Sequence, residues 1–268
     1  PEQGIGNTWE LTIDAVDGTV LRRNNRLRTL FGGTEDASYN VFPSDSPGPG
    51  SPGAPAPNGF QFPFVNRTLI TQGATADSPE GWIPDGVNET AGNNVDAHSD
   101  LDSDNQPDLP RPQGSPYRVF DFPYDPIGDP ALYTDAAIVQ AFWALNNMHD
   151  RLYALGFDEA AGNFQLDNFG QGGVGGDPVR VEVQDGSGHN NANWNGNGND
   201  GSTTRIQMFL FDGADPERDS ALDNDLLYHE YAHGLSTRLN GGNMFLGQSG
   251  AMGEGWSDYF GISMNAEP

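Results

Sequence analysis

Cysteine and lysine are both missing from this chain of 268 residues. Without cysteine there is no disulfide framework, and nothing about the redox compartment follows from the composition. All 12 basic residues are arginine, and they face 38 aspartate and glutamate residues, which gives a net charge of −26. A surface this acidic should repel nucleic acid and anionic membranes. We interpret the charge as a solubility adaptation.

Long apolar runs are missing as well, so no membrane span is predicted, and the N-terminus has no signal-peptide pattern. Hydrophobic residues make up 35% of the chain and include 15 Phe and 5 Trp, which is enough for the core of one large or two small domains. Because the sequence begins at Pro1 and ends at Pro268, we expect it to be a piece of a longer protein.

The most informative stretch is an H-E-x-x-H pattern that runs from His229 to His233. Its chemistry depends on a helix, because the i, i+4 spacing then puts both imidazoles on one face, where they can converge on one ion. A helix is predicted here because Ser220 followed by Asp223 resembles a capping box and leucines recur at helical spacing. Gly241 gives a stop signal.

A catalytic zinc ion usually takes three protein ligands and leaves one position to water. Glu254, on a second predicted helical segment, is the candidate third ligand. Asp258 lies one turn further on and is placed to accept the distal N–H of a ligand histidine. Glu230, beside the first histidine but not aimed at the metal, would be the general base. The alternative is a chance pattern on a polar helix, which the downstream carboxylates and the few other histidines disfavour.

Two segments, Tyr228–Leu239 and Met252–Asp258, together resemble the fungalysin family of metallopeptidases, which are relatives of thermolysin. The resemblance implies that the two histidines and the downstream glutamate bind zinc and that the glutamate inside the motif is the base. It also implies an α+β fold, the N-terminal lobe of a thermolysin-like peptidase, with a mixed, largely antiparallel sheet, an active-site helix and a backing helix. We expect the helical C-terminal lobe of that family to be absent from this chain.

The same resemblance divides the chain near residue 37. Residues 9–21 alternate around Asp17-Gly18 as a hairpin does. Residues 9–20 are similar to the closing strands of thermolysin-type and fungalysin-type propeptides, which implies that residues 1–36 are the end of a propeptide-like segment and a linker. The alternative is an ordinary edge hairpin of the main domain. Residues 37–268 would be the N-terminal part of the catalytic domain, interrupted by a Pro/Gly/Ser-rich insert at residues 46–58 that is expected to be a solvated loop.

The backing helix is predicted over residues 135–157, where apolar residues form a broad stripe. His149 lies on it and is left out of the zinc site, because a lone helical histidine is more often structural. Residues 185–194 resemble the segment that forms the edge strand of the cleft in thermolysin-like enzymes, where the substrate backbone adds as an extra strand. Asn191 and Ala192 are therefore candidate substrate contacts, with a surface loop as the alternative.

An acidic segment offers a candidate second metal site. Asp100, Asp102, Asp104 and Asp108 place carboxylates at alternate positions in a turn-rich stretch. Such oxygen-rich spacing suits calcium, but the glycine and the terminal glutamate of an EF-hand loop are absent. The pattern fits a calcium site and a solvated acidic loop equally well.

Two functions follow from these observations. The first is a secreted zinc endopeptidase that cleaves proteins and peptides, uses Glu230 as its base, and is partnered by its own propeptide or a missing C-terminal lobe. The second is a non-catalytic or incomplete structural module that binds zinc or calcium. The second reading is motivated by a gap: no residue here matches the histidine that stabilises the oxyanion in relatives of the family. Zinc content measured together with peptide hydrolysis would separate the two.

Overall fold

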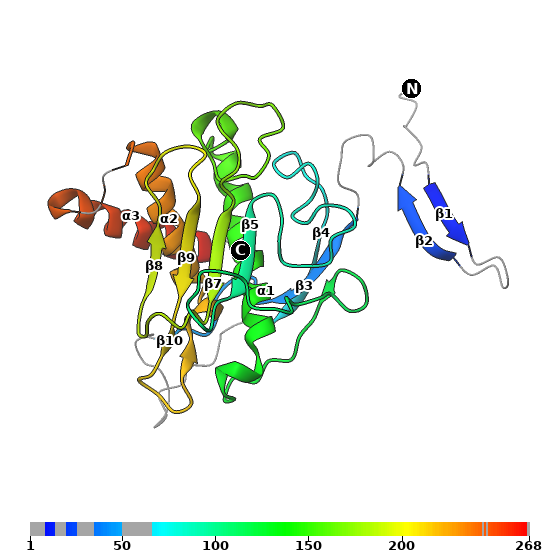
Figure 1. Cartoon of the computed structure of the whole chain (residues 1–268), viewed down its shortest axis with the longest axis horizontal. Helices are drawn as coiled ribbons and strands as arrows, with labels where there is room; N and C mark the ends of the chain where they lie inside the picture. The colour runs from blue at the N-terminus through cyan, green and yellow to red at the C-terminus, as the bar shows by residue number, and fades with distance from the viewer. Residues whose placement is uncertain are drawn as a thin grey trace.

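The fold is centred on a four-stranded sheet with the strand order β5-β7-β9-β8 (Figure 1). The computed structural model describes residues 9–13, 20–25, 35–49, 66–242, 244 and 246–266. The four strands are β5 (Val95–Ser99), β7 (Val179–Val183), β9 (Thr204–Met208) and β8 (Ala192–Asn195). β5, β7 and β9 are parallel, and β8 runs antiparallel to β9. β8 is therefore one edge of this sheet and β5 is the other.

The parallel majority in this sheet corrects the prediction of a largely antiparallel one, whereas the prediction of a mixed sheet is confirmed. Parallel neighbours need a long crossover connection. Helix α1 (Thr134–Ala154) lies in the connection from β5 to β7 and supplies that crossover. Alternation of apolar and polar residues along a segment predicts a strand. It does not show which other strand lies beside it, so the parallel pairing of β5, β7 and β9 could not be predicted.

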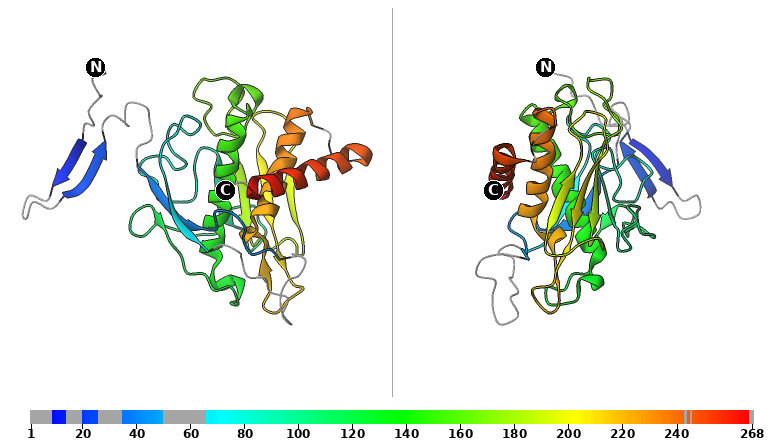
Figure 2. Two further views of the ribbon diagram at one scale, coloured as in Figure 1. Left: turned by 180° about the vertical axis from the view of Figure 1, so that it is seen from behind. Right: turned by 60° about the vertical axis from the view of Figure 1, so that its left-hand side comes forward.

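Helix α1 is the predicted backing helix, although it ends at Ala154 rather than at residue 157. It contacts β5 and β7 as well as β3 (Ala37–Val41), and it also contacts helix α2 (Asn224–Leu239). Figure 2 shows α1 running through the middle of the molecule. Because it is covered by several elements, α1 is buried on most of its surface, which explains its broad apolar stripe.

Three smaller sheets complete the described strands. β3 lies between β4 (Thr68–Gln72), which is antiparallel to it, and β6 (Val119–Phe120), which is parallel. β10 (Leu210–Phe211) pairs with β11 (Arg218–Asp219). Short 3-10 helices lie at η2 (Pro130–Leu132), η3 (Glu159–Ala161) and η4 (Ser220–Leu222).

The predicted N-terminal hairpin is present as β1 (Trp9–Ile13) and β2 (Val20–Asn25), which pair antiparallel. The turn predicted at Asp17-Gly18 lies outside the described residues. Among the strands that the structure describes, β1 and β2 form a sheet of their own. The assignment of this hairpin to a propeptide-like segment or to the main domain stays a prediction.

The start of the Pro/Gly/Ser-rich insert is buried rather than solvated as predicted. Ser46 is 6% exposed, and its hydroxyl accepts the backbone N–H of Asn224 at 2.9 Å. Arg218 donates to the carbonyl of Pro49 at 2.8 Å. These contacts hold residues 46–49 against β11 and the start of α2. Residues 50–58 of the insert lie outside the described part of the chain.

Helix α2 begins later than the predicted capping box implies. Asp223 is its N-cap, and the side chain accepts the backbone N–H groups of Asp225 and Leu226. Ser220, the expected cap, lies in η4, is buried, and donates its hydroxyl to the carbonyl of Phe209 at 2.7 Å. Its hydroxyl therefore bonds to a residue that is distant in the sequence, which a local sequence pattern cannot predict.

Helix α3 (Gly247–Ala266) crosses α2 at close range, as the views in Figure 2 show. The approach requires glycine at position 261, because a Cβ there would lie 2.9 Å from the carbonyl oxygen of Asp225 on α2. α3 is the second helical segment that the sequence predicts, and it carries Glu254. No helix in the described part of the chain combines the length and the apolarity that a membrane crossing needs.

Candidate metal centre

Three side chains from α2 and α3 bring donor atoms together. His229 and His233 lie one turn apart on α2, and their Nε2 atoms are 3.0 Å apart. Glu254 reaches them from α3, with its Oε2 atom 3.2 Å from Nε2 of His229 and 3.4 Å from Nε2 of His233. The structure therefore brings together all three predicted ligands.

The protonation pattern of His229 explains why these atoms face one another. Its Nδ1 lies 2.9 Å from Oδ1 of Asp258, one turn after Glu254 on α3. Because a carboxylate only accepts, Nδ1–H is the donor and Nε2 carries the lone pair in the neutral ring. That lone pair points toward a second imidazole nitrogen and a carboxylate oxygen, an arrangement that a shared cation stabilises.

The distances are close to those of a zinc site. Ligand atoms about 2.0–2.2 Å from a tetrahedral zinc ion lie about 3.3–3.6 Å from one another. The separation of 3.4 Å falls in this range, and those of 3.0 and 3.2 Å are slightly shorter, so the donor atoms need to move only a little apart to hold the ion. The pKa of His233 is lowered by burial and then by the neighbouring His229, which favours the neutral imidazole that binds metals. Two histidines and one glutamate are the ligands of several catalytic zinc sites.

Glu230 lies beside this centre but is not one of the three converging donors. Its side chain is 5% exposed, and burial raises its pKa to about 8, with a further upward contribution from the charge of Glu254. The backbone N–H of Trp194 on β8 acts in the opposite direction. A carboxyl whose pKa lies near the working pH can both accept and donate a proton, which is what general acid–base catalysis requires.

An open pocket joins the metal centre to the edge strand β8. The residues that line it are Asn191, Ala192, Asn193, Trp194, His229, Glu230, His233, Met244, Gly250 and Glu254. Both predicted substrate contacts are thus in the pocket, with Asn191 exposed and Ala192 at the start of β8.

One edge of β8 faces away from β9, on the side of this pocket. β8 pairs only with β9 among the described strands. In an antiparallel pair, successive residues alternate between facing the partner and facing away. Asn191 directs its carbonyl to the N–H of Phe209, and the N–H of Trp194 is directed away from β9 to Glu230. Ala192, two residues before Trp194, therefore presents its backbone groups to the same free edge.

Gly234, next to His233, allows β8 to lie this close to α2. A Cβ at this position would lie 2.9 Å from Nε1 of Trp194 and 3.0 Å from the ring of Phe164. The indole of Trp194 consequently packs against the helix backbone directly beside the metal centre. Sequence reasoning missed Trp194 as a functional residue, because its contribution to Glu230 is a backbone N–H, which no side-chain pattern reveals.

The structure groups three of the four aspartates of the acidic loop and leaves the fourth outside the group. Asp100, Asp102 and Asp104 each place an oxygen within 4.8 Å of the others. Asp108 does not join that group within the described residues; its carboxylate accepts the backbone N–H of Leu101 at 2.8 Å. Asp100 is fully buried, whereas Asp102 and Asp104 are more exposed.

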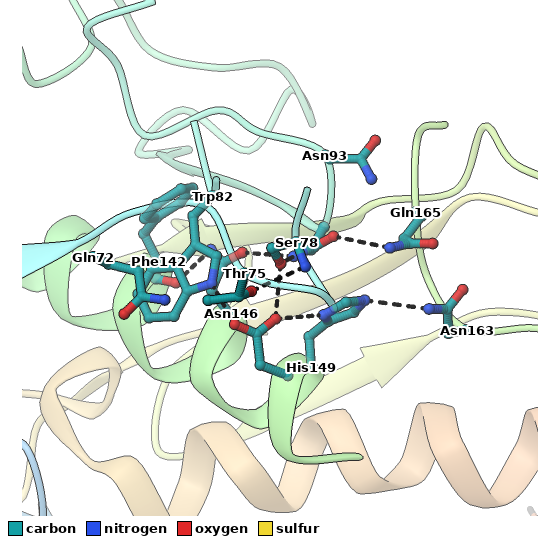
Figure 3. A network of polar contacts seen from close by, with 12 residues as sticks. Gln72, Thr75, Ser78, Trp82, Asn93, Phe142, Asn146, His149, Asn163 and Gln165 are labelled. Carbon is teal, nitrogen blue, oxygen red and sulfur yellow. Dashed lines mark hydrogen bonds and ion pairs between the residues drawn. The ribbon is translucent and has the colours of Figure 1, made fainter. Parts of the chain in front are cut away.

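His149 lies away from the metal centre, as the sequence predicts, and belongs to a buried polar network (Figure 3). Its Nδ1 is 3.0 Å from the carboxylate of Asp150, and its Nε2 is 3.3 Å from the side-chain amide of Asn163. Asp150 also accepts the hydroxyl of Ser78 and the indole N–H of Trp82. The network joins the C-terminal end of α1 to two loops, so His149 is structural.

Comparison with known proteins gives consistent results. Residues 55–268 match the family described as Fungalysin metallopeptidase (M36). The chain is 36% identical over 276 residues to "Probable extracellular metalloproteinase 4" of Arthroderma benhamiae, covering 100% of this chain and 40% of that protein. It is 36% identical to "Extracellular metalloproteinase MEP" of Leptosphaeria maculans, covering 100% of this chain and 41% of that protein. It is also 42% identical to "Extracellular metalloproteinase 5" of Arthroderma benhamiae, covering 97% of this chain and 41% of that protein.

Proposed function

The chain belongs to the fungalysin family of metallopeptidases, and we propose that it forms the zinc-binding part of a secreted endopeptidase that hydrolyses peptide bonds in proteins. The observation that carries this proposal is the convergence of His229, His233 and Glu254 within 3.0–3.4 Å of one another, beside a buried glutamate and a free strand edge. The chain spans about 40% of the length of the relatives named above. The activity of those longer proteins is therefore a proposal for this chain.

In this proposal, His229, His233 and Glu254 hold one zinc ion, and Asp258 fixes the tautomer and the ring orientation of His229. When bound, zinc supplies Lewis acidity, which polarises a peptide carbonyl and lowers the pKa of a water molecule. Glu230 accepts the proton of the attacking water and later donates it to the amine of the leaving peptide. The N–H of Trp194 keeps the carboxylate of Glu230 directed toward the pocket.

The substrate backbone binds to β8 as an additional strand. Ala192 supplies backbone hydrogen bonds from the edge that β9 leaves free, and Asn191 adds its exposed side-chain amide. This mode recognises an extended peptide through its main chain, because every peptide bond carries the same donor and acceptor. It therefore supports an endopeptidase that acts within protein chains.

Zinc content and hydrolysis, measured on the same preparations, test this function. We expect one zinc ion per chain and cleavage of an unfolded protein such as casein. Glu230→Gln should keep the zinc and lose at least 100-fold in turnover, since a general base contributes typically 10²–10⁴-fold. His233→Ala should lose the zinc, whereas His189→Ala, an exposed histidine near Glu217, should keep it. Full activity in Glu230→Gln, or zinc retained by His233→Ala, would contradict the proposal.

The alternative function is a module that holds zinc without turnover. It is favoured by the outer face of α3, where Met252, Trp256, Tyr259 and Ile262 are between 40% and 66% exposed. Exposed apolar side chains gathered on one face of a helix typically mark a site where another protein surface packs. We propose that a helical C-terminal lobe covers this face in the complete peptidase and completes the oxyanion site. Stoichiometric zinc with no measurable hydrolysis by this chain would favour the module.

The N-terminal residues 1–36 are proposed to be the end of a propeptide and its linker, and residues 37–268 to be part of the catalytic domain. The separate β1–β2 sheet supports this division. If the linker is cut on maturation, N-terminal sequencing of the active form should locate the cut between residues 22 and 34. An active form that retains Trp9 would contradict the division. Secretion is supported by the relatives, which are named extracellular.

A further inference from the structure

A second group of carboxylates lies at the sheet edge opposite β8. Asp100 follows the end of β5, Glu182 lies on β7, and Asp185 follows the end of β7. β5 and β7 are parallel neighbours, so their C-terminal ends meet. The three side chains are only 0%, 1% and 2% exposed, and one oxygen from each lies within 4.8 Å of the others. β9 lies between β7 and β8, the strand that borders the zinc site.

N–H donors fix two of the three carboxylates, whereas Glu182 has only a carboxyl–carboxyl hydrogen bond with Asp185. Asp100 accepts the backbone N–H groups of Asp104 and Asn105, at 3.0 and 2.9 Å. Asp185 accepts the backbone N–H of Ser187 and the side-chain amide of Gln207. The Oε2 atom of Glu182 is buried and has no hydrogen-bond donor in the part of the chain that the structure describes.

Arginine does not balance this charge. Arg205 places Nε 3.3 Å from Oε2 of Glu182, but the two atoms are not aligned for a hydrogen bond. Its side chain is 27% exposed, so part of its charge is screened by solvent. Three buried carboxylates against one partly exposed guanidinium leave an excess of negative charge. A buried excess of this kind is unfavourable unless a proton or a cation neutralises it.

The geometry points to calcium. Calcium binds oxygen ligands at about 2.3–2.6 Å, so two of its ligands can lie as much as about 4.6–5.2 Å apart. The three carboxylate oxygens lie close enough together for one such ion, and an oxygen-only donor set disfavours zinc. Magnesium usually keeps several waters and is rarely held by a dedicated cage of protein ligands, so three buried carboxylates suit calcium better. We propose that Asp100, Glu182 and Asp185 bind one calcium ion, which ties the acidic loop after β5 to β7.

Calcium titration of metal-stripped protein, reloaded with one equivalent of zinc, tests this proposal. We expect one calcium ion per chain by calorimetry and a rise in Tm of roughly 5–10 °C at a calcium concentration 100 times the Kd. Glu182→Gln should abolish both signals. It should still fold, because its amide can donate to Asp185, and without calcium its Tm should equal or exceed that of the wild type. Asp108→Asn, in the same loop but outside the group, should bind calcium as the wild type does.

Three outcomes would overturn the proposal. Wild-type protein that neither binds calcium nor gains stability from it would show that Glu182 and Asp185 share a proton instead. Calcium binding that survives Glu182→Gln but is lost in Asp102→Asn would assign the ion to the exposed loop alone. An equal rise in Tm with magnesium would show that the site does not select the larger ion.

Discussion

The C-terminal half of α2 is held by a buried ion pair, and its removal tests how the metal centre is positioned. Arg238 lies five residues after His233 and is 7% exposed, and its partner Asp177 is 0% exposed, with an N–O distance of 2.9 Å. Arg238 also donates to the carbonyl of Gly162 at 2.6 Å, and its guanidinium lies 4.5 Å from the ring centroid of Phe164. Arg238→Met keeps most of the apolar stem and removes the charge.

Arg238→Met should destabilise the protein by about 3–5 kcal/mol, since it leaves Asp177 buried without a cation. That corresponds to a fall in Tm of roughly 6–20 °C. Burial already raises the pKa of Asp177, and Arg238 opposes that rise. Without Arg238, the folded state holds the proton of Asp177 to higher pH than the unfolded state does. Stability is therefore lost as the pH rises above about 3.9, and the loss is larger at pH 7 than at pH 4.

Chemical unfolding at pH 4 and pH 7, followed by tryptophan fluorescence, measures both effects. Asp177→Asn keeps an oxygen that can accept the N–H of Gln165 and removes the charge. The double variant Arg238→Met with Asp177→Asn should consequently be more stable at pH 7 than Arg238→Met alone, by about 1–3 kcal/mol. A double variant whose loss equals the sum of the two single losses, or an Arg238→Met loss independent of pH, would refute the electrostatic explanation.

Other predictions address the same framework. Asp258→Ala should lower zinc affinity about 10–100-fold by releasing Nδ1 of His229, and Asp258→Asn, which keeps an acceptor, should lower it less; equal affinities would contradict the positioning role. Gly261→Ala should destabilise by about 1–3 kcal/mol because its Cβ meets the backbone of Asp225, whereas Gly255→Ala, with open space around it, should stabilise by up to about 1 kcal/mol. Burial raises the pKa of Asp219 to about 6, above an unfolded value near 3.9. The free energy of unfolding, relative to Asp219→Asn, should therefore fall by about 2 kcal/mol between pH 4 and pH 7 in denaturant titrations, and a flat difference would contradict it.

The convergence of the three candidate ligands could be predicted from the sequence because its information is local. His229 and His233 are fixed relative to each other by helical spacing alone, and Glu254 and Asp258 are fixed relative to each other in the same way. Only the crossing of the two helices had to be inferred, and the family resemblance supplied it. The structural reason for that crossing is the glycine at position 261, which a sequence pattern presents only as a weak helix former.

The rest depended on contacts between distant segments, which periodicity does not encode. The parallel pairing of β5 with β7 joins residues more than 80 positions apart in the chain. The acidic loop drew attention because its aspartates alternate, yet the buried partners of Asp100 are Glu182 and Asp185, which stand alone in the sequence. Ser220 matches a local capping pattern, but its hydroxyl donates a hydrogen bond to the carbonyl of Phe209 and does not cap the helix.

The two helices of the metal centre are anchored to different degrees. α2 is held at its start by Asn224, whose side chain donates to the carbonyls of Phe42 and Ser44, and at its end by Arg238. α3 is anchored near its C-terminal end, where Arg151 donates to the carbonyl of Met264. The third ligand lies in the other half of α3, and its side chain is 64% exposed.

A zinc ion shared by the two helices would therefore fix mainly α3, since α2 is already held. A surface that covers the exposed side of α3 would fix the same helix from outside. Two ligands that stabilise one conformation strengthen each other, and the coupling is reciprocal. It follows that a lobe packed on Trp256, Tyr259 and Ile262 should raise the affinity for zinc, and that zinc should raise the affinity for the lobe by the same factor. The exposed apolar face and the exposed third ligand are thus two aspects of one weakly anchored helix.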